Sequence, residues 1–397
     1  MLWSHNVLAS GGMSMEMLAQ GWLVLMITDS PFWVGAVSGL RGIGQLLLAP
    51  IGGVLTDRFD RRRILQVCQT LRSIIPLSIG LLWALDRIEL WYLLITGLFG
   101  GILFAIATPS NGTLIFDIVG PKRLLNAMAL QFAAFNIARL PGSIMIGFLI
   151  STAGMATAYF VIAVAFASSL IPLYFMKSRP PSSRAQQSVL ENLKSGLQYV
   201  AKNRTIRRVL IFTILIEAFG FGHMVMLPVI ARDYLEVGAE GLGFLGAASS
   251  IGALLGITTL ALAGDVRTKG ILLLIFSAII GTSVILFGIS PWYGVSLVLV
   301  GVIQAGLVTY DSTLNTTLLL MALDNMRGRI LGLVSFAYGF TPIGGFIYGV
   351  IASSAGAPIA LAVGGGIILT GWAGLMLPMG ALRKPMEPMT TEPVHET

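Results

Sequence analysis

The sequence predicts an all-α membrane protein in which twelve transmembrane helices form two pseudo-symmetric six-helix bundles. Three observations carry this prediction: the apolar composition, the number of apolar runs, and the placement of the charges. Hydrophobic residues make up 55% of the 397-residue chain and charged residues 11%, whereas soluble domains carry about 25% charged residues. With a mean hydropathy of +0.85, most of the protein surface is expected to face lipid.

Apolar runs of membrane-spanning length recur along the whole chain. A transmembrane helix needs about 20 predominantly apolar residues. The runs that meet this requirement predict helices at 5–27, 32–56, 64–85, 91–116, 124–151, 156–176, 208–229, 239–263, 268–289, 291–320, 328–352 and 357–380.

The basic residues fall mainly on one side of this topology. Of the 25 Lys and Arg residues, 20 lie in loops on one side or in the C-terminal tail, and only Arg87 and Arg232 lie opposite. This asymmetry is the positive-inside pattern of membrane proteins, and it predicts that both termini are cytoplasmic. Because topology explains the net charge of +7, we expect no nucleic-acid partner.

One long polar connection divides the chain. Residues 177–207, counted together with Arg208, hold eight basic residues and one acid, Glu191. Apolar residues between Val189 and Val200 recur at helical spacing, which predicts an amphipathic helix at the cytoplasmic interface. The resulting units are an N-terminal six-helix bundle (1–176), this linker (177–207), a C-terminal six-helix bundle (208–380) and a cytoplasmic tail (381–397).

The two halves also resemble each other. The segment Asn111-Gly112-Thr113-Leu114 matches Asn315-Thr316-Thr317-Leu318 at an offset of 204 residues, and Pro141-Gly142 has a counterpart near Pro342. Weak internal symmetry is typical of transporters built from repeats, whose substrate sites lie near the midplane between the repeats.

Ionisable residues inside the predicted spans are few. Such residues are costly in a bilayer and are functional candidates by default. Arg72 and Asp117 lie near the cytoplasmic side, where they either snorkel or pair with loop charges. The candidates for a substrate or proton pathway, together with one neighbouring asparagine, are Glu16, Arg41, Asn136, Arg139, Glu217 and Asp311.

Glu16 and Arg41 lie at similar depth on adjacent helices. Each is about half a span from the loop at 28–31, so a buried pair offsets the cost of both charges. In a functional interpretation, Glu16 takes a proton or cation and Arg41 contacts an anionic substrate; in the alternative, the pair is only structural. Arg139, one turn from Asn136, either contacts substrate or satisfies carbonyls freed near Pro141.

The second half offers two further groups. Glu217 and His223 are six residues apart and do not share a helical face, so Glu217 alone is the stronger candidate. Asp311 opens a polar stripe with Gln304, Tyr310 and Asn315 that is expected to line a cavity. Three aromatic residues, which more often only pack, are candidates for shaping that cavity: Trp22, Phe221 and Tyr338.

The sequence contains no catalytic constellation. It lacks a phosphate-binding loop, zinc-type histidine spacing and a Gly-x-Ser-x-Gly elbow. The single cysteine, Cys68, has no partner in the chain, and there are only three histidines. We therefore expect no enzyme activity, cofactor or metal, and an ion gradient rather than ATP as the energy source.

The segment Gly53-x3-Asp57-Arg58-x2-Arg61-Arg62-Arg63 resembles the signature loop of the major facilitator superfamily. Ala19-Gln20-Gly21-Trp22 and Asn136-x2-Arg139-x2-Gly142 are similar to its enterobactin (siderophore) and macrolide exporter branch. The sequence departs from the family pattern at Asp60, where a second glycine is usual, and at Pro141 and Ser143, where the helix-5 glycine–proline step is altered.

The resemblance implies a monomeric secondary transporter of the bacterial inner membrane that works by alternating access. It implies proton-coupled export of a small organic molecule such as a siderophore or a drug. It further implies a cytoplasmic conformational latch made of Gly53, Asp57, Arg58, Arg61 and Arg62. The alternatives are an importer of the same fold and a non-transporting membrane sensor or scaffold.

Overall fold

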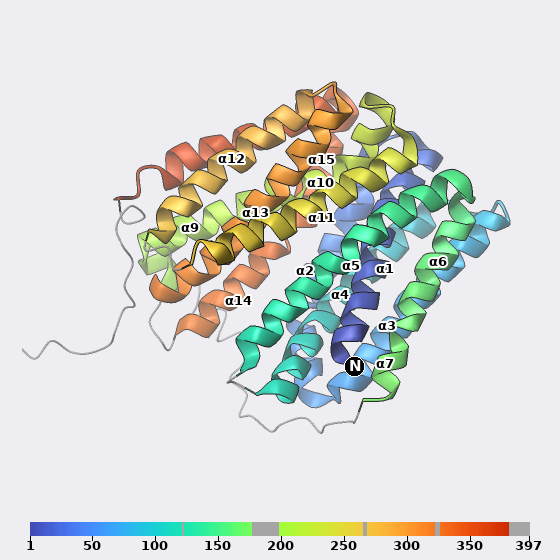
Figure 1. The fold of residues 1–397 in the computed structure, drawn as a ribbon, viewed down its shortest axis with the longest axis horizontal. Coiled ribbons are helices and arrows are strands. Elements are labelled where there is room, and N and C mark those ends of the chain that lie inside the picture. Colours follow the sequence, from blue (N-terminus) through green and yellow to red (C-terminus); the bar gives the residue numbers. More distant parts are fainter. Residues whose placement is uncertain (121–122, 177–197, 265–267, 322–325, 381–397) are drawn as a thin grey trace, which may run out of the picture.

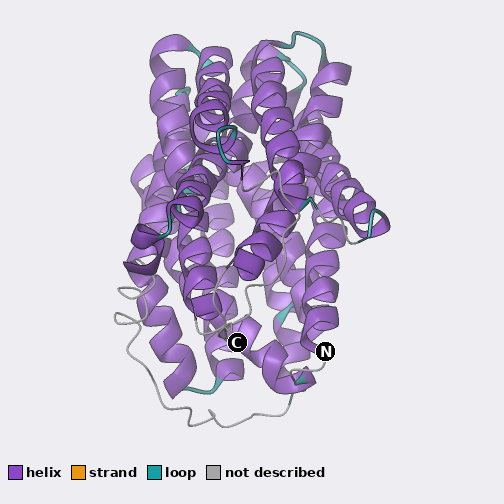
Figure 2. Cartoon of the chain, turned by 90° about the vertical axis from the view of Figure 1, so that its left-hand side faces the viewer, coloured by secondary structure: helices purple, strands orange, loops and turns teal. Residues whose placement is uncertain are grey.

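The structure is a computed structural model that describes residues 1–120, 123–176, 198–264, 268–321 and 326–380. Within these ranges the regular elements are helices. Figure 1 shows the N-terminal helices, blue to green, on one side of the molecule and the C-terminal helices, yellow-green to red, on the other. The helices run roughly along one common direction (Figure 2), as expected for segments that cross a bilayer.

The N-terminal group of helices precedes the linker. Its members are α1 (Leu2–Thr28), α2 (Pro31–Arg58), α3 (Arg61–Ala84), α4 (Leu90–Val119), α5 (Leu124–Thr152), α6 (Gly154–Ser168) and α7 (Leu170–Tyr174).

The C-terminal group includes three π-helical turns, labelled η. Its members are α9 (Arg204–Leu215), η2 (Ile216–Phe221), α10 (His223–Val229), η3 (Ile230–Tyr234), α11 (Gly238–Leu262), α12 (Lys269–Ile289), α13 (Tyr293–Met321), α14 (Arg327–Tyr338), α15 (Thr341–Ala355), α16 (Ala357–Gly371) and η5 (Trp372–Met376).

Eleven helical stretches of the described chain are long and apolar enough to cross a membrane. This confirms a multi-pass membrane protein. Helix α1 has 27 residues but is not among the eleven. Polar side chains interrupt its apolar character, and several of them are buried against other helices, including His5, Asn6, Ser14 and Gln20.

Helix ends differ from the sequence prediction where a side chain caps the backbone. Helix α3 begins at Arg61 rather than at residue 64, because the carboxylate of Asp60 accepts a hydrogen bond from Arg62 N at 2.9 Å. Helix α9 begins at Arg204 rather than at residue 208, because the side chain of Asn203 accepts from the first backbone amides. Such N-caps satisfy amides that have no partner within the helix.

Four predicted continuous spans are interrupted. The sixth divides into α6 and α7 at Ser169, and the eleventh divides into α14 and α15 at residues 339–340, just before Pro342. Proline is tolerated in the first turn of a helix, where its missing N–H costs nothing. The seventh span contains η2 and continues into η3, and the twelfth contains η5; π-helical turns of this kind are frequent at functional sites.

Two pairs of helices connect the N-terminal and C-terminal groups most closely: α5 with α11, and α2 with α15. Both contacts use glycine. A Cβ atom on Gly35 would lie 2.8 Å from Gly349 Cα, and one on Gly147 would lie 2.9 Å from Gly243 Cα. Without side chains at these positions the backbones approach each other, as is common between helices in lipid.

These close contacts lie toward one end of the molecule, called the short-loop end. It carries the connections at 29–30, 85–89, 235–237 and 290–292. The opposite, arginine-rich end carries the loop at 59–60 and the start of α9. Most of the predicted linker helix, the tail at 381–397 and residues 265–267 lie outside the described residues.

Candidate functional site

A cavity of about 470 Å³ lies between the two groups of helices. It is lined by α1, α2, α4 and α5 on one side and by η2, α10, α11, α14 and α15 on the other. Most of the lining is apolar, with methionine, valine and phenylalanine side chains. The charged side chains among the described lining residues are Arg41 and Arg139.

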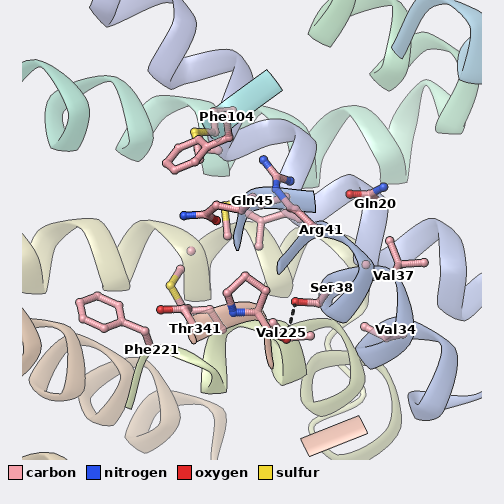
Figure 3. Close-up of a pocket in the computed structure, with 18 of the residues that line it drawn as sticks. Gln20, Val34, Val37, Ser38, Arg41, Gln45, Phe104, Phe221, Val225 and Thr341 are labelled. Atoms are coloured by element: carbon pink, nitrogen blue, oxygen red, sulfur yellow. Dashed lines mark hydrogen bonds between the residues drawn. The ribbon is translucent and has the colours of Figure 1, made fainter. Parts of the chain in front are cut away.

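Figure 3 shows how polar groups enter this apolar space. Arg41 and Gln45 extend from α2, with Phe104 of α4 nearby, while Phe221 and Thr341 approach from the C-terminal helices. Ser38 donates a hydrogen bond to the carbonyl of Pro342 at 3.4 Å, directly across the interface. A few polar groups in a mostly apolar pocket are the usual composition of a small-molecule site.

Glu16 and Arg41 form an ion pair. Arg41 Nη2 lies 3.9 Å from Glu16 Oε2, and the two side chains are 15% and 12% exposed. The guanidinium of Arg72, which lies 5.1 Å from the ring centroid of Phe166, interacts electrostatically with both charges. Two arginines therefore share one carboxylate, and the group carries a net positive charge beside the cavity.

Arg139 reaches from α5 to the C-terminal helices. Its Nη2 donates to the sulfur of Met224 at 3.2 Å and to Ser249 Oγ at 3.4 Å. Ser249 in turn donates to Gln304 Oε1 at 3.3 Å. Among the described residues, no carboxylate lies within 4 Å of Arg139, so this buried cation has neutral partners only.

Glu217 of η2 and Asp311 of α13 both lie in the C-terminal helices. Oε2 of Glu217 accepts a hydrogen bond from Thr341 Oγ1 at 2.7 Å. Oε1 of Glu217 and Oδ1 of Asp311 are buried and have no hydrogen-bond partner in the part of the chain that the structure describes. The two carboxyl groups interact electrostatically, and neither belongs to the cavity lining.

The other predicted site residues pack behind the cavity. Asn136 is buried in α5, and the α13 stripe faces neighbouring helices. In that stripe Tyr310 bonds Thr213, and Asn315 donates to the hydroxyl of Tyr338 at 3.2 Å. Of the three aromatic candidates, Phe221 and Tyr338 line the cavity.

The predicted latch residues lie at the arginine-rich end. Arg61 forms an ion pair with Asp117 of α4. Arg62 donates from Nε to Leu173 O at 2.7 Å and from Nη2 to the next carbonyl at 2.8 Å. Arg58 is exposed, and a Cβ on Gly53 would meet nothing within 4 Å. The side chain of Asp57 lies outside the described residues.

We expect Arg62→Ala to destabilise the protein by about 1–2 kcal/mol, because its guanidinium satisfies the terminal carbonyls of α7. The midpoint of thermal unfolding of the purified protein measures this loss. Arg63→Ala is the matched control, since Arg63 is exposed and lies 4.0 Å from Asp60. Equal midpoints for the two variants would contradict the capping role.

A polar cluster that sequence reasoning missed closes the short-loop end. Arg232 of η3 donates from Nη1 to Leu25 O of α1 at 2.9 Å and forms ion pairs with Asp29 and Asp233. The carbonyl of Leu25 lies in the last turn of α1, where a cation is favoured. The signal available in the sequence was that Arg232 is one of only two basic residues on its side.

We expect Arg232→Ala to weaken closure of the short-loop end by about 1 kcal/mol, or roughly five-fold in the conformational equilibrium. In a Cys68→Ser background, the reaction of a Ser38→Cys thiol with an impermeant reagent added at the short-loop side should accelerate accordingly. Arg87→Ala, which removes the other basic side chain at this end, should leave the rate unchanged. Equal rates in both variants would show that Arg232 does not hold the end closed.

Comparison with known proteins identifies the family. A family model described as a transmembrane secretion effector, within the major facilitator superfamily, matches residues 1–395. The chain belongs to this superfamily. The enterobactin exporter EntS of Escherichia coli O1:K1 is 25% identical over 316 residues, covering 78% of this chain and 74% of the exporter. EntS of Shigella boydii serotype 18 is 24% identical with the same coverage.

Solved major facilitator structures share the fold. A bacterial homologue of the human lysosomal transporter Spinster, in an inward-facing and unoccupied conformation, aligns with a TM-score of 0.73 and 14% identity, covering 95% of each chain. The nucleoside transporter NupG aligns with a TM-score of 0.74 and 15% identity, covering 94% of this chain and 97% of its own. These relatives are transporters rather than enzymes, as the sequence predicted for this chain.

Proposed function

We propose that this protein is a proton-coupled exporter of a small organic molecule that works by alternating access. The observation that carries the proposal is the cavity between the two groups of helices, because both groups line it and close contacts between them join one end. When one group of helices rocks against the other, a site between them becomes accessible from the opposite side of the membrane. The exporter would act as a monomer.

The proposal includes a membrane topology of twelve spans. Helix α1 is the first of twelve spans, and residues 1–176 and 208–380 are the two six-helix bundles. The positive-inside rule places the arginine-rich end in the cytoplasm of a bacterial cell, with both termini there. Because the two groups of helices are in close contact at the short-loop end, substrate would reach the cavity from the opposite, cytoplasmic end. An exporter loads its substrate from the cytoplasm.

The chemistry of the cavity supports an amphiphilic substrate. A volume of about 470 Å³ lies within the range of small-molecule pockets. Its apolar walls suit rings and alkyl groups, and Arg41 and Arg139 suit anionic or strongly accepting oxygens. A siderophore fits this description and is favoured by the likeness to enterobactin exporters; a drug-like molecule is the alternative.

In the outward-facing state, the loop at 53–63 would latch the arginine-rich end. Arg61 forms an ion pair and Arg62 forms a hydrogen bond with residues of the N-terminal helices. These interactions fix the start of α3. Arg58 is exposed and free to approach the C-terminal helices when the end closes. Gly53, with open space around it, leaves room for that approach.

The proposal is tested by transport into inverted membrane vesicles with an imposed pH gradient, acid inside. Enterobactin and erythromycin are the probes, and an uncoupler is added in parallel. Accumulation that needs the protein and collapses with the uncoupler is the expected result. Gradient-independent equilibration would contradict proton coupling. Movement only out of the vesicles would indicate an importer, and no protein-dependent flux would indicate a sensor or scaffold.

A further inference from the structure

We propose that Glu217 and Asp311 together bind the coupling proton, at a site in the C-terminal helices that is separate from the two arginines of the cavity. This inference rests on the proposed proton-coupled function. It assigns the proton to one specific pair among the acidic groups inside the membrane, and it excludes Glu16 from that role.

The first observation is the position of Glu217. Glu217 is 3% exposed, and it lies in the π-helical turn η2, which departs from regular α-helix geometry. One carboxyl oxygen accepts from Thr341, whereas Oε1 is buried and has no hydrogen-bond partner among the described residues. A buried oxygen left in this state is costly, and a proton bound there removes the charge and supplies a donor.

The second observation is that Asp311 shares this situation. The residue is half-buried, but its Oδ1 is buried and has no hydrogen-bond partner among the described residues, and its charge acts on Glu217. Among the described residues, no Lys, Arg or His lies within 4 Å of either carboxyl group. Two carboxylates that interact in this way repel each other, and a proton bound by either of them relieves this repulsion.

The other titratable groups that the structure describes around the pair supply no balancing cation. Tyr310 bonds Thr213, Tyr338 accepts from Asn315, and Tyr348 donates to Phe219 O. Nδ1 of His223 bonds the carbonyl of Gly220, and Lys269 lies at the far start of α12. The α9 basic residues lie at the start of that helix, with Arg208 nine residues before Glu217, or about 13 Å along a helix.

A proton suits this site better than a metal cation. Sodium and other hard cations bind through several oxygen ligands at once. Among the described residues there is no group of three or more acidic, histidine or cysteine side chains that could hold a metal ion. Two carboxyl groups and the hydroxyl of Thr341 suffice to bind a proton.

Oε2 of Glu16 also lacks a hydrogen-bond partner among the described residues, but Glu16 differs from this pair because arginines balance its charge. Arg41 lies 3.9 Å away, and Arg72 also acts electrostatically on the same cluster. Protonation of Glu16 would leave two buried arginines without a counter-charge, which is costly. Glu16 is therefore a structural partner that holds Arg41 at the cavity.

Thr341 connects the proton site to the cavity. It lines the cavity, where Figure 3 shows it near Phe221, and its hydroxyl donates to Glu217. Tyr338, another lining residue, interacts electrostatically with both carboxyl groups. The two residues flank the break between α14 and α15. Binding or release of the proton therefore alters contacts at the cavity wall and at the helix break at the same time.

An infrared pH titration of the purified full-length protein tests the site without transport. Wild type should show the carbonyl band of a protonated carboxylic acid, and this band should disappear as the pH is raised. The double variant Glu217→Gln/Asp311→Asn should lose the band, whereas Glu16→Gln and the exposed-loop control Glu89→Gln should keep it. A band that survives in the double variant, is lost in Glu16→Gln, or responds to sodium at constant pH would overturn the assignment.

A transport measurement separates failure of this inference from failure of the proposed function. With enterobactin in proteoliposomes, Glu217→Gln should lower pH-driven accumulation at least ten-fold and retain exchange of labelled for unlabelled substrate. If wild type shows neither accumulation nor exchange, the proposed function fails, while the infrared result still decides the proton site. If Glu217→Gln accumulates substrate like wild type, the assignment of the proton site is wrong, whereas the proposed export function stands. Gel filtration verifies that the variants fold.

Discussion

Replacing Arg139 by alanine should lower pH-driven accumulation of substrate at least ten-fold. Arg139 is a buried cation whose hydrogen-bond partners among the described residues, Met224 and Ser249, are neutral. Its positive charge can therefore bind an anionic oxygen of the substrate or an oxygen that accepts a hydrogen bond. A charge-assisted hydrogen bond contributes about 1.5–3 kcal/mol, which corresponds to about ten- to a hundred-fold in affinity. Transport into proteoliposomes at several substrate concentrations measures the loss.

The control for Arg139 is Arg87→Ala, which removes an exposed arginine from a short-loop connection. It should transport like wild type. Arg139→Lys keeps the charge but not the planar fork of donors, and it should recover only part of the activity. If Arg139→Ala transports like Arg87→Ala, the cavity does not bind substrate through this cation.

The second large effect is expected at Gly101 of α4. A Cβ atom there would lie 1.9 Å from the carbonyl oxygen of Arg41 and 3.0 Å from Gln45 N. These are backbone atoms of α2 at the cavity, and they cannot move aside as a flexible side chain would. Gly101→Ala should therefore displace α2, with a loss of stability at the upper end of the range of about 1–3 kcal/mol known for overpacking, and it should impair transport.

The neighbouring residue provides a matched control for this prediction. A Cβ on Gly100 would meet nothing within 4 Å, so Gly100→Ala should be neutral or stabilise α4 by about 0.5–1 kcal/mol through helix propensity. Thermal unfolding and transport are measured for both variants. If both behave alike, close packing of α2 on α4 does not position Arg41.

Sequence counting predicted that Glu16 and Arg41 lie at the same level of their helices, but it did not predict which side of each helix faces the cavity. Counting residues from the loop at 28–31 placed Glu16 and Arg41 at the same level, and the structure shows them as an ion pair. Counting cannot tell which side of a span faces the cavity when the span is apolar all round. Arg41 and Arg139 line the cavity, whereas Glu217 and Asp311 lie behind it.

Features that depend on contacts between distant segments were not predictable. The π-helical turn at Glu217 and the helix break before Thr341 leave no mark in the apolar pattern, because hydropathy averages over a whole span. Gln45, a polar lining residue, was missed because it is not ionisable. The ion pairs of Arg232 were missed because its partner Asp29 is about 200 residues earlier in the chain.

The altered loop motif now has a physical explanation at Asp60. Where the family pattern has glycine, this chain uses the carboxylate to cap α3, accepting from Arg62 N at 2.9 Å. The cap fixes the start of α3, from which Arg61 reaches Asp117. This substitution favours a rigid attachment of the loop to the N-terminal helices.

Alternating access is the central claim, and distances between spin labels at both ends of the protein test it most directly. In a Cys68→Ser background, one labelled pair replaces Thr152 and Ser353 at the short-loop end, and the other replaces Arg63 and Arg204 at the arginine-rich end. All four residues are exposed. Pulsed electron paramagnetic resonance in lipid, with pH and enterobactin varied, should show the first distance growing as the second shrinks. Two distances that stay fixed, or that change in the same direction, would contradict the account.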